Sequence, residues 1–219
     1  MFRVKICGIT SIADALAAVD AGADAIGLNF SSASPRACDV ASARAIAAAL
    51  PEHVIKVGVF VNAPAEEIRR TVAEVGLNLV QLHGDEPPTL LHQIKPQAVM
   101  RVFRVAGDFA MVDDYLQACH RLACMPRMVL VDALCPGQFG GTGQKVDWGA
   151  AAAARHHFRG LPLVLAGGLN PTNVAAAIAA VRPWGVDTAS GVETAPGRKS
   201  AELVRAFVAE AKAAMARVA

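Results

Sequence analysis

The chain has 219 residues, 54% hydrophobic and 18% charged, so it is long enough to bury one large core, and we expect a single domain over residues 1–219. Its 21 basic and 19 acidic residues are interspersed and give a net charge of +2, which excludes the basic footprint typical of nucleic-acid-binding proteins. Aromatic residues make up only 5% of the chain, which argues against a base-stacking surface and against a nucleic-acid partner.

The cysteines and one long apolar segment indicate a cytoplasmic, non-membrane protein. The five cysteines are odd in number and form no CxxC pair, so neither a disulfide framework nor a zinc site is predicted. The N-terminus lacks the apolar core of a signal peptide, because Lys5 interrupts it. Residues 160–181 carry no Lys, Arg, Asp or Glu and are long enough to cross a membrane, but Gly167-Gly168 begins a turn cluster that divides them into strand, loop and helix.

Eight short runs rich in Val, Ile and Leu recur along the chain, separated by segments with helical spacing. Continuous apolar runs are typical of parallel strands covered on both faces. The runs are Val4–Cys7, Ala25–Phe30, Val54–Val61, Leu77–Leu82, Ala98–Phe103, Met128–Asp132, Leu161–Ala166 and Trp184–Thr188. Eight strands alternating with helices predict a (β/α)8 TIM barrel. A doubly wound open sheet is the alternative, but the first run ends in Cys7-Gly8-Ile9-Thr10 without the GxGxxG sequence of such sheets.

Two of the intervening segments carry clear helix signals. Ile12, Leu16 and Val19 share one helix face, and Ser11 precedes them as an N-cap. Asn170-Pro171 predicts another helix start, with proline at the first helical position.

The active site of a barrel lies where its strands end, so the polar residues closing each run are the candidates for chemistry. They are Cys7, Asn29, Asn62, Gln81 with His83, Arg104, Asp132 and Asp187. Asp132 ends an apolar strand, where a buried carboxyl group must reach solvent, find a partner, or take a raised pKa and act as an acid. Asp187 is predicted to be structural, accepting backbone N–H groups of the following turn. Cys7 is either a small buried hydrophobe or a reactive thiol.

Loops with glycine follow strands six, seven and eight and are candidates for binding a phosphate group. Backbone N–H groups at glycine approach an anion closely, and a helix start adds partial positive charge. Each loop alone is more simply a tight turn, but together they predict a phosphorylated small-molecule substrate. The candidate phosphate-binding residues are Gly143, Gly167, Gly168, Ser190 and Gly191.

Two further side chains are candidates for substrate binding. Arg36 lies in the loop after strand two, where it either grips a carboxylate in a bidentate fork or is a lone surface arginine. His83 follows strand four and either positions the substrate or titrates. Metal catalysis is not predicted, because the strand ends offer no two-His-one-carboxylate set and no HExxH sequence occurs.

Eight motifs, in register along the chain, resemble those of phosphoribosylanthranilate isomerases. They lie at residues 5–10 (KICGIT), 22–27 (GADAIG), 34–36 (SPR), 57–62 (VGVFVN), 81–84 (QLHG), 140–143 (GGTG), 167–171 (GGLNP) and 190–193 (SGVE). The resemblance spans Val4 to the last helix. It implies an isomerase of tryptophan biosynthesis that converts N-(5'-phosphoribosyl)anthranilate to 1-(2-carboxyphenylamino)-1-deoxyribulose 5-phosphate without metal or organic cofactor.

The resemblance also implies roles for three residues. Cys7 matches the family's general base, Asp132 its general acid, and Arg36 the residue that holds the anthranilate carboxylate. A base must be the thiolate, so we expect the site to lower the pKa of Cys7 from its ordinary value of about 8.5. Lys5, two residues away on the same strand face, is the candidate for this effect.

Some features depart from the family pattern or leave alternatives open. Asn29-Phe30-Ser31-Ser32 replaces an aromatic-rich stretch, Ala189 stands where the first of two serines is common, and Gln144 replaces a common lysine. A histidine-pathway sugar isomerase would carry aspartate in place of Cys7. A catalytically silent barrel would tolerate the loss of Cys7 or Asp132, and both are present. Monomer and homodimer both remain open.

Overall fold

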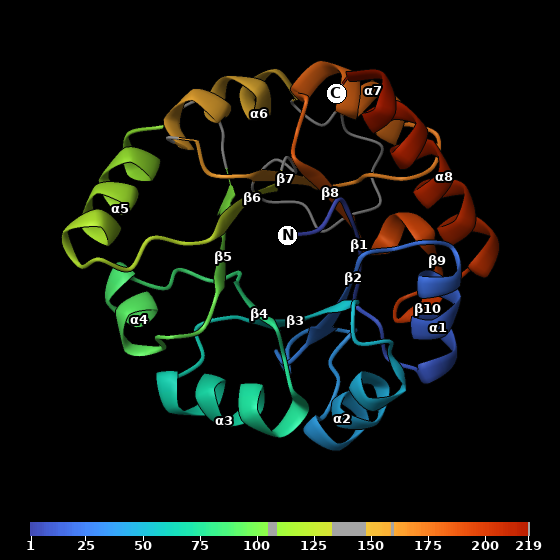
Figure 1. Cartoon of the computed structure of the whole chain (residues 1–219), viewed down its shortest axis with the longest axis horizontal. Helices are drawn as coiled ribbons and strands as arrows, with labels where there is room; N and C mark the ends of the chain where they lie inside the picture. The colour runs from blue at the N-terminus through green and yellow to red at the C-terminus, as the bar shows by residue number, and fades with distance from the viewer. Residues whose placement is uncertain (105–108, 133–147, 159, 219) are drawn as a thin grey trace.

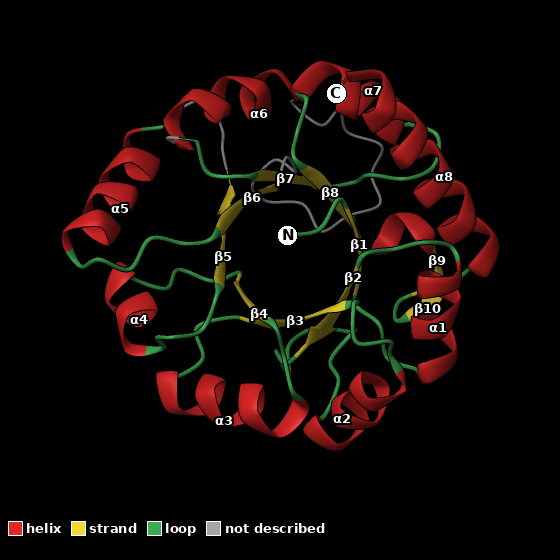
Figure 2. Cartoon of the chain, in the orientation of Figure 1, coloured by secondary structure: helices red, strands yellow, loops and turns green. Residues whose placement is uncertain are grey.

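The computed structural model describes residues 1–104, 109–132, 148–158 and 160–218. Eight parallel strands close into a barrel in chain order, and helices form a ring outside them (Figure 1, Figure 2). The strands are β1 (Val4–Cys7), β2 (Ala25–Asn29), β3 (Ile55–Phe60), β4 (Leu79–Leu82), β5 (Val99–Arg104), β6 (Met128–Asp132), β7 (Leu163–Ala166) and β8 (Gly185–Thr188). Each overlaps its predicted run, and the predicted TIM barrel is confirmed.

The helices alternate with the strands, and a small hairpin precedes the last helix. The α-helices are α1 (Ile12–Asp20), α2 (Val40–Ala49), α3 (Ala65–Val75), α4 (Pro88–Gln93), α5 (Ala110–Arg121), α6 (Trp148–Ala154), α7 (Val174–Val181) and α8 (Ala201–Val218). Two 3-10 turns, η1 (Arg155–Phe158) and η2 (Ser190–Val192), and the hairpin of β9 (Glu193–Ala195) and β10 (Arg198–Lys199) complete the described elements. None of the helices in the described ranges is long and apolar enough to cross a membrane.

Strand residues alternate between the barrel interior and the surrounding helices. The residues that fill the interior are Phe2, Ala25, Val57, Leu79, Met100, Val102, Met128, Leu130, Val164 and Ala166. Because side chains alternate along a strand, the same parity turns Asp132 inward at the end of β6. Lys5 pairs in register with Ala25, and Cys7 with Gly27, so both side chains of β1 also point into the barrel. The side chains of Lys5, Cys7 and Asp132 therefore all point into the barrel interior.

Helix α1 begins as predicted but buries a different face. The Ser11 side chain accepts a backbone N–H at the helix start, which confirms the N-cap. The buried residues of the helix are Ala15 and Ala18, whereas Ile12 and Leu16 are 42% and 39% exposed. Small alanines let the helix lie close to the barrel, so they replace the larger side chains on the packed face.

Helix α7 begins three residues after the predicted start. Its N-cap residue is Asn173, and the helix itself starts at Val174. Asn170 closes a local turn instead, because its Oδ1 accepts hydrogen bonds from both the backbone N and the Oγ1 of Thr172. The predicted proline at the first helical position was therefore wrong.

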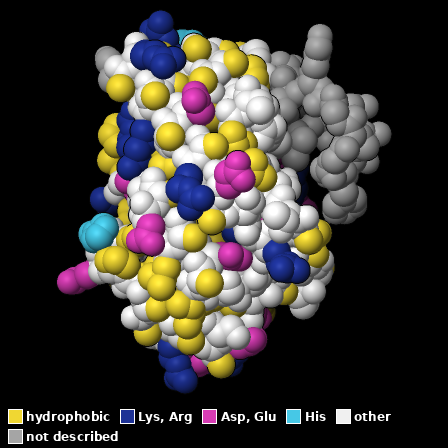
Figure 3. Space-filling view, turned by 90° about the vertical axis from the view of Figure 1, so that its right-hand side faces the viewer, with side chains coloured by type: hydrophobic (Ala, Val, Ile, Leu, Met, Phe, Trp, Pro, Cys, Tyr) yellow, Lys and Arg dark blue, Asp and Glu magenta, His cyan; other side chains and the backbone are white. Residues whose placement is uncertain are grey.

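The surface over α1 and α8 carries charges of both signs. Figure 3 shows basic and acidic side chains interspersed with apolar ones on this face. A single-sign patch of the kind that binds nucleic acid is not seen on this face.

Candidate active site

A cavity of about 450 Å³ opens at the carboxyl ends of the strands. Its lining includes ten of the residues that the sequence singled out, whereas Asn62 and Arg104 are not part of it. The ten are Cys7, Asn29, Arg36, Gln81, His83, Asp132, Gly167, Gly168, Asp187 and Ser190. Gly191 lies next to this lining, in η2. Gly143 and the rest of its glycine loop lie outside the described residues.

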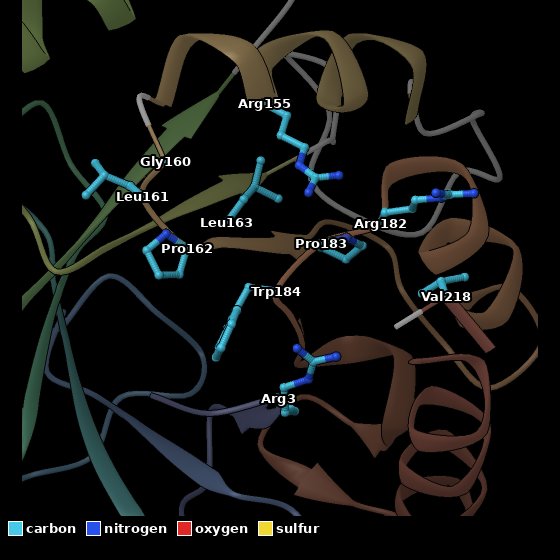
Figure 4. Close-up of a pocket in the computed structure, with 10 residues that line it drawn as sticks. All are labelled: Arg3, Arg155, Gly160, Leu161, Pro162, Leu163, Arg182, Pro183, Trp184 and Val218. Atoms are coloured by element: carbon cyan, nitrogen blue, oxygen red, sulfur yellow. The ribbon is translucent and has the colours of Figure 1, made fainter. Parts of the chain in front are cut away.

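A second cavity, of about 490 Å³, lies at the opposite end of the barrel, where β7 and β8 begin (Figure 4). It is lined by Arg3, Arg155 and Arg182 together with Trp184, and the guanidinium carbon of Arg3 lies 5.1 Å from the centre of the Trp184 ring. Its lining includes no thiol, carboxylate or imidazole that could act as an acid or base. The cavity at the carboxyl ends is therefore the candidate active site.

The position of the Cys7 thiol depends on the glycine beside it. Gly27 is the register neighbour of Cys7 on β2. A Cβ atom at Gly27 would lie 2.7 Å from Cys7 Sγ and 3.1 Å from Lys5 Cε. Real Cβ atoms almost never approach another atom so closely, so glycine provides the space in which the thiol and the lysine stem lie.

Lys5 and Asp187 form an ion pair inside the barrel, and Asp187 also lines the cavity. Lys5 Nζ lies 2.9 Å from Asp187 Oδ2, and the two side chains are 0% and 7% exposed. The residues are register neighbours on β1 and β8, so the closed barrel brings them together. The prediction that Asp187 accepts backbone N–H groups of the following turn was wrong. Its buried carboxylate lies next to the inward-facing Lys5 and forms an ion pair with the ammonium group instead.

The electrostatic surroundings of Cys7 act in opposite directions. Burial raises the pKa of the Cys7 thiol above its ordinary value; Lys5, and more weakly Lys199, oppose this rise, while Asp187 adds to it. Burial also lowers the pKa of Lys5, but Asp187 and Cys7 outweigh that effect and keep the pKa above its usual value. Lys5 is thus the expected cation beside Cys7, but the expected net lowering of the pKa of Cys7 was wrong.

Asp132 and His83 lie next to each other in the lining of the cavity. His83 Nε2 lies 3.7 Å from Asp132 Oδ2, and the side chains are 28% and 18% exposed. The other ring nitrogen of His83, Nδ1, lies 3.2 Å from the amide nitrogen of Gln81. With that amide donating to Nδ1, the ring carries its proton on Nε2, the nitrogen that faces Asp132. Gln81 thereby orients the imidazole toward the carboxyl group.

Arg36 forms an ion pair with a residue to which the sequence assigned no role. Its Nε and Nη2 donate to Glu193 Oε1 and Oε2 at 2.9 and 2.7 Å, and these hydrogen bonds raise the pKa of Arg36. Glu193 also accepts a 2.7 Å bond from Lys199, whose side chain is only 1% exposed. The last residue of the SGVE motif was the available signal, but the motif alone did not indicate the partner of Glu193.

The loop after β7 offers backbone N–H groups as hydrogen-bond donors. Gly167 and Gly168 have φ angles of +94° and +63°, which favour glycine. Their N–H groups donate no hydrogen bond to any residue that the structure describes. Thr188 Oγ1 donates a 2.6 Å bond to the carbonyl of Leu169, so the two loops are joined. This geometry suits the binding of an anion by backbone N–H groups.

Comparison with known proteins identifies the family. The model of the N-(5'-phosphoribosyl)anthranilate (PRA) isomerase family matches residues 4–210. N-(5'-phosphoribosyl)anthranilate isomerases from Geobacter sp. (strain M21) and Rubrobacter xylanophilus are 47% and 45% identical, over 97% of this chain and 98% and 100% of theirs. The chain belongs to this family.

The solved structures agree with the assignment to the PRA isomerases. The crystal structure of the enzyme from Thermotoga maritima is 41% identical and superimposes with a TM-score of 0.86, covering 97% of this chain and 100% of that one. Another PRA isomerase, 40% identical with a TM-score of 0.83 over 97% and 100% of the two chains, was solved in complex with reduced 1-(o-carboxyphenylamino)-1-deoxyribulose 5-phosphate. As a member of this family, this chain is an isomerase of tryptophan biosynthesis.

Proposed function

We propose that the isomerisation uses Cys7 as general base and Asp132 as general acid. The observation that carries the proposal is that a thiol at the end of β1 and a carboxyl group at the end of β6 line the same cavity. Each group lies at the end of a strand, at the edge where barrel enzymes do their chemistry. An acid and a base on facing strand ends can act on two atoms of one sugar.

The reaction is an Amadori rearrangement and needs one proton in and one proton out. Asp132 donates a proton to the ribose ring oxygen as the C1'–O4' bond breaks, and the nitrogen lone pair forms the C1'=N bond. The Cys7 thiolate then removes the C2' proton, and the C2'–H electrons form C1'=C2' while the C1'=N pair returns to nitrogen. The enolamine loses its hydroxyl proton and gains a proton at C1', which gives the C2' ketone with the substrate's formula unchanged.

The remaining groups of the cavity suit the two charged ends of the substrate. Arg36 is proposed to bind the anthranilate carboxylate through charge-assisted hydrogen bonds. The N–H groups of Gly167 and Gly168, with Ser190 and Gly191 across the joined loop, are proposed to hold the phosphate. His83 is proposed to position the substrate beside Asp132. Support comes from the relative solved with the reduced product analogue, a ligand that carries both a ring carboxylate and a phosphate.

Turnover of phosphoribosylanthranilate, followed by loss of anthranilate fluorescence, tests the proposal. General acid and base groups contribute about 10²–10⁴-fold each, so Cys7→Ser and Asp132→Asn should each lower kcat by that order. Cys124→Ser and Asp20→Asn are matched controls away from the cavity and should keep wild-type rates. Circular dichroism must show that every variant is folded. Full activity in either site variant would remove the role assigned to that residue, and a wild-type protein without turnover would favour the silent barrel.

A further inference from the structure

The Arg36 guanidinium presents one of its two bidentate edges to the protein itself. Nε donates to Glu193 Oε1 at 2.9 Å and Nη2 donates to Oε2 at 2.7 Å, so Glu193 occupies the Nε–Nη2 edge. No hydrogen bond to a described residue uses Nη1. A planar guanidinium carries five donors in a fixed fork. The Nη1–Nη2 edge of Arg36 thus remains available for a second carboxylate.

The stem of Arg36 is held in place as well as its head. A Cβ atom at Gly8 would lie 2.5 Å from Arg36 Cδ, so the arginine passes directly over the backbone that follows Cys7. The backbone N–H of Arg36 donates to Ser34 Oγ at 3.1 Å. The Arg36 side chain is 22% exposed and lines the cavity. The free edge therefore belongs to a side chain with little freedom to move.

Glu193 is fixed by contacts on the β9–β10 hairpin. Its Oε1 accepts a 2.7 Å hydrogen bond from Lys199 Nζ and a 3.2 Å bond from the N–H of Gly197. Lys199 also donates a 3.0 Å bond to the carbonyl of Ala189, the first residue after β8. The Glu193 side chain is only 4% exposed. Because these contacts hold the Glu193 carboxylate in place, its two hydrogen bonds with Arg36 fix the plane of the guanidinium group.

The charges of the cluster also favour an anionic ligand. Arg36 and Lys199 are cations and Glu193 is an anion, so the three side chains leave one net positive charge beside the cavity. Burial tends to raise the pKa of Glu193, but hydrogen bonds from Arg36 and Lys199 outweigh it and lower the pKa, which keeps the carboxylate ionised. Glu193 therefore orients Arg36 while leaving the cluster attractive to a carboxylate.

We propose that Glu193, held by Lys199, is a positioning residue that presents the Nη1–Nη2 edge of Arg36 to the aromatic carboxylate of the substrate. This inference rests on the role proposed for Arg36 and adds a residue that acts through it. The alternative role for Glu193 is purely structural, to hold the hairpin against the loop after β2. A structural residue would affect the affinity for every ligand equally, whereas a positioning residue increases the affinity only for ligands that carry the ring carboxylate.

Two ligands measured by calorimetry separate these roles. One is reduced 1-(o-carboxyphenylamino)-1-deoxyribulose 5-phosphate, and the other is the same molecule without the ring carboxylate. Glu193→Gln should weaken binding of the first ligand by about tenfold, as expected for one misplaced charge-assisted hydrogen bond. It should change the affinity for the second ligand by less than about twofold. Arg36→Met should abolish the preference for the carboxylated ligand, and adding Glu193→Gln to Arg36→Met should have no further effect.

Controls separate failure of this inference from failure of the proposed function. Glu210→Gln, an exposed glutamate of α8, should bind both ligands as the wild type does, and thermal unfolding must show that Glu193→Gln is folded. Equal weakening of both ligands, or no weakening of either, would overturn the positioning role alone. Failure of the wild type to prefer the carboxylated ligand would overturn the role of Arg36 and, with it, that of Glu193.

Discussion

Replacing Lys5 with methionine should destabilise the barrel by about 3–5 kcal/mol, because it removes one partner of a buried ion pair. Methionine keeps the unbranched shape of the stem that runs past Gly27, so packing changes little. The Asp187 carboxylate stays behind in the interior. In the wild type its Oδ2 lies 2.9 Å from Lys5 Nζ, and its Oδ1 accepts no hydrogen bond from any described residue. In the variant the buried carboxylate has lost its cation.

The magnitude can be assigned to the pair by a double-mutant cycle. Domains of this kind are stable by about 5–15 kcal/mol, so the loss is large enough to measure by urea unfolding. Asp187→Asn removes the second charge without changing the shape of the side chain. The double variant Lys5→Met/Asp187→Asn should be more stable than the sum of the single changes predicts, by about 3 kcal/mol.

The cost should also depend on pH with a defined sign. Burial already raises the folded-state pKa of Asp187 above its unfolded value of about 3.9, and Lys5 opposes that rise. Without Lys5 the pKa of Asp187 should rise further, and only the ionised carboxylate is destabilising. The deficit is therefore complete above the folded-state pKa and shrinks as the pH falls through it. Lys5→Met should lose less stability at pH 5 than at pH 8. A variant as stable as the wild type at pH 8, a deficit that grows on acidification, or additive effects in the cycle would refute the reasoning.

Two further predictions concern the thiol and the phosphate loops. Asp187→Asn removes an anion that raises the pKa of Cys7, so alkylation of Cys7 by iodoacetamide should reach half its maximal rate at lower pH, while Lys5→Met should shift that midpoint upward. Unchanged midpoints in both variants would contradict this account. A Cβ atom at Gly191 would collide with the carbonyl oxygen of Leu169, so Gly191→Ala should separate the joined loops and raise the inhibition constant of inorganic phosphate about tenfold. An unchanged constant would show that the loops do not hold the phosphate.

The barrel and the location of its cavity could be predicted because they follow from local patterns. Each apolar run is a strand, and the alternation of side chains decides which polar strand ends face inward. Cys7 and Asp132 reach one cavity for this reason. Local patterns were less reliable for helix faces and starts, as Ile12 shows: its spacing is helical, but alanines make the packed face.

The ionic partners could not be predicted, because they join residues far apart in the sequence. Lys5 and Asp187 are 182 positions apart, and Arg36 and Glu193 are 157 apart. Only closure of the barrel makes β1 and β8 neighbours, and only the hairpin after η2 brings Glu193 to the loop after β2. The net direction of the Cys7 pKa shift was missed for a related reason, since it is set first by burial, which outweighs Lys5, and Asp187 adds to the rise.

The Lys5–Asp187 ion pair has a consequence for efforts to make this enzyme more heat-resistant. Replacing a buried ion pair by apolar side chains of similar volume is often neutral or stabilising by about 1–4 kcal/mol. Selection for stability alone would therefore favour apolar side chains at these two positions in the barrel interior. That change would also remove the ammonium group that favours the thiolate form of Cys7. Thermal robustness and catalytic turnover therefore compete for the same two positions, and a library screened only for survival after heating should enrich inactive barrels.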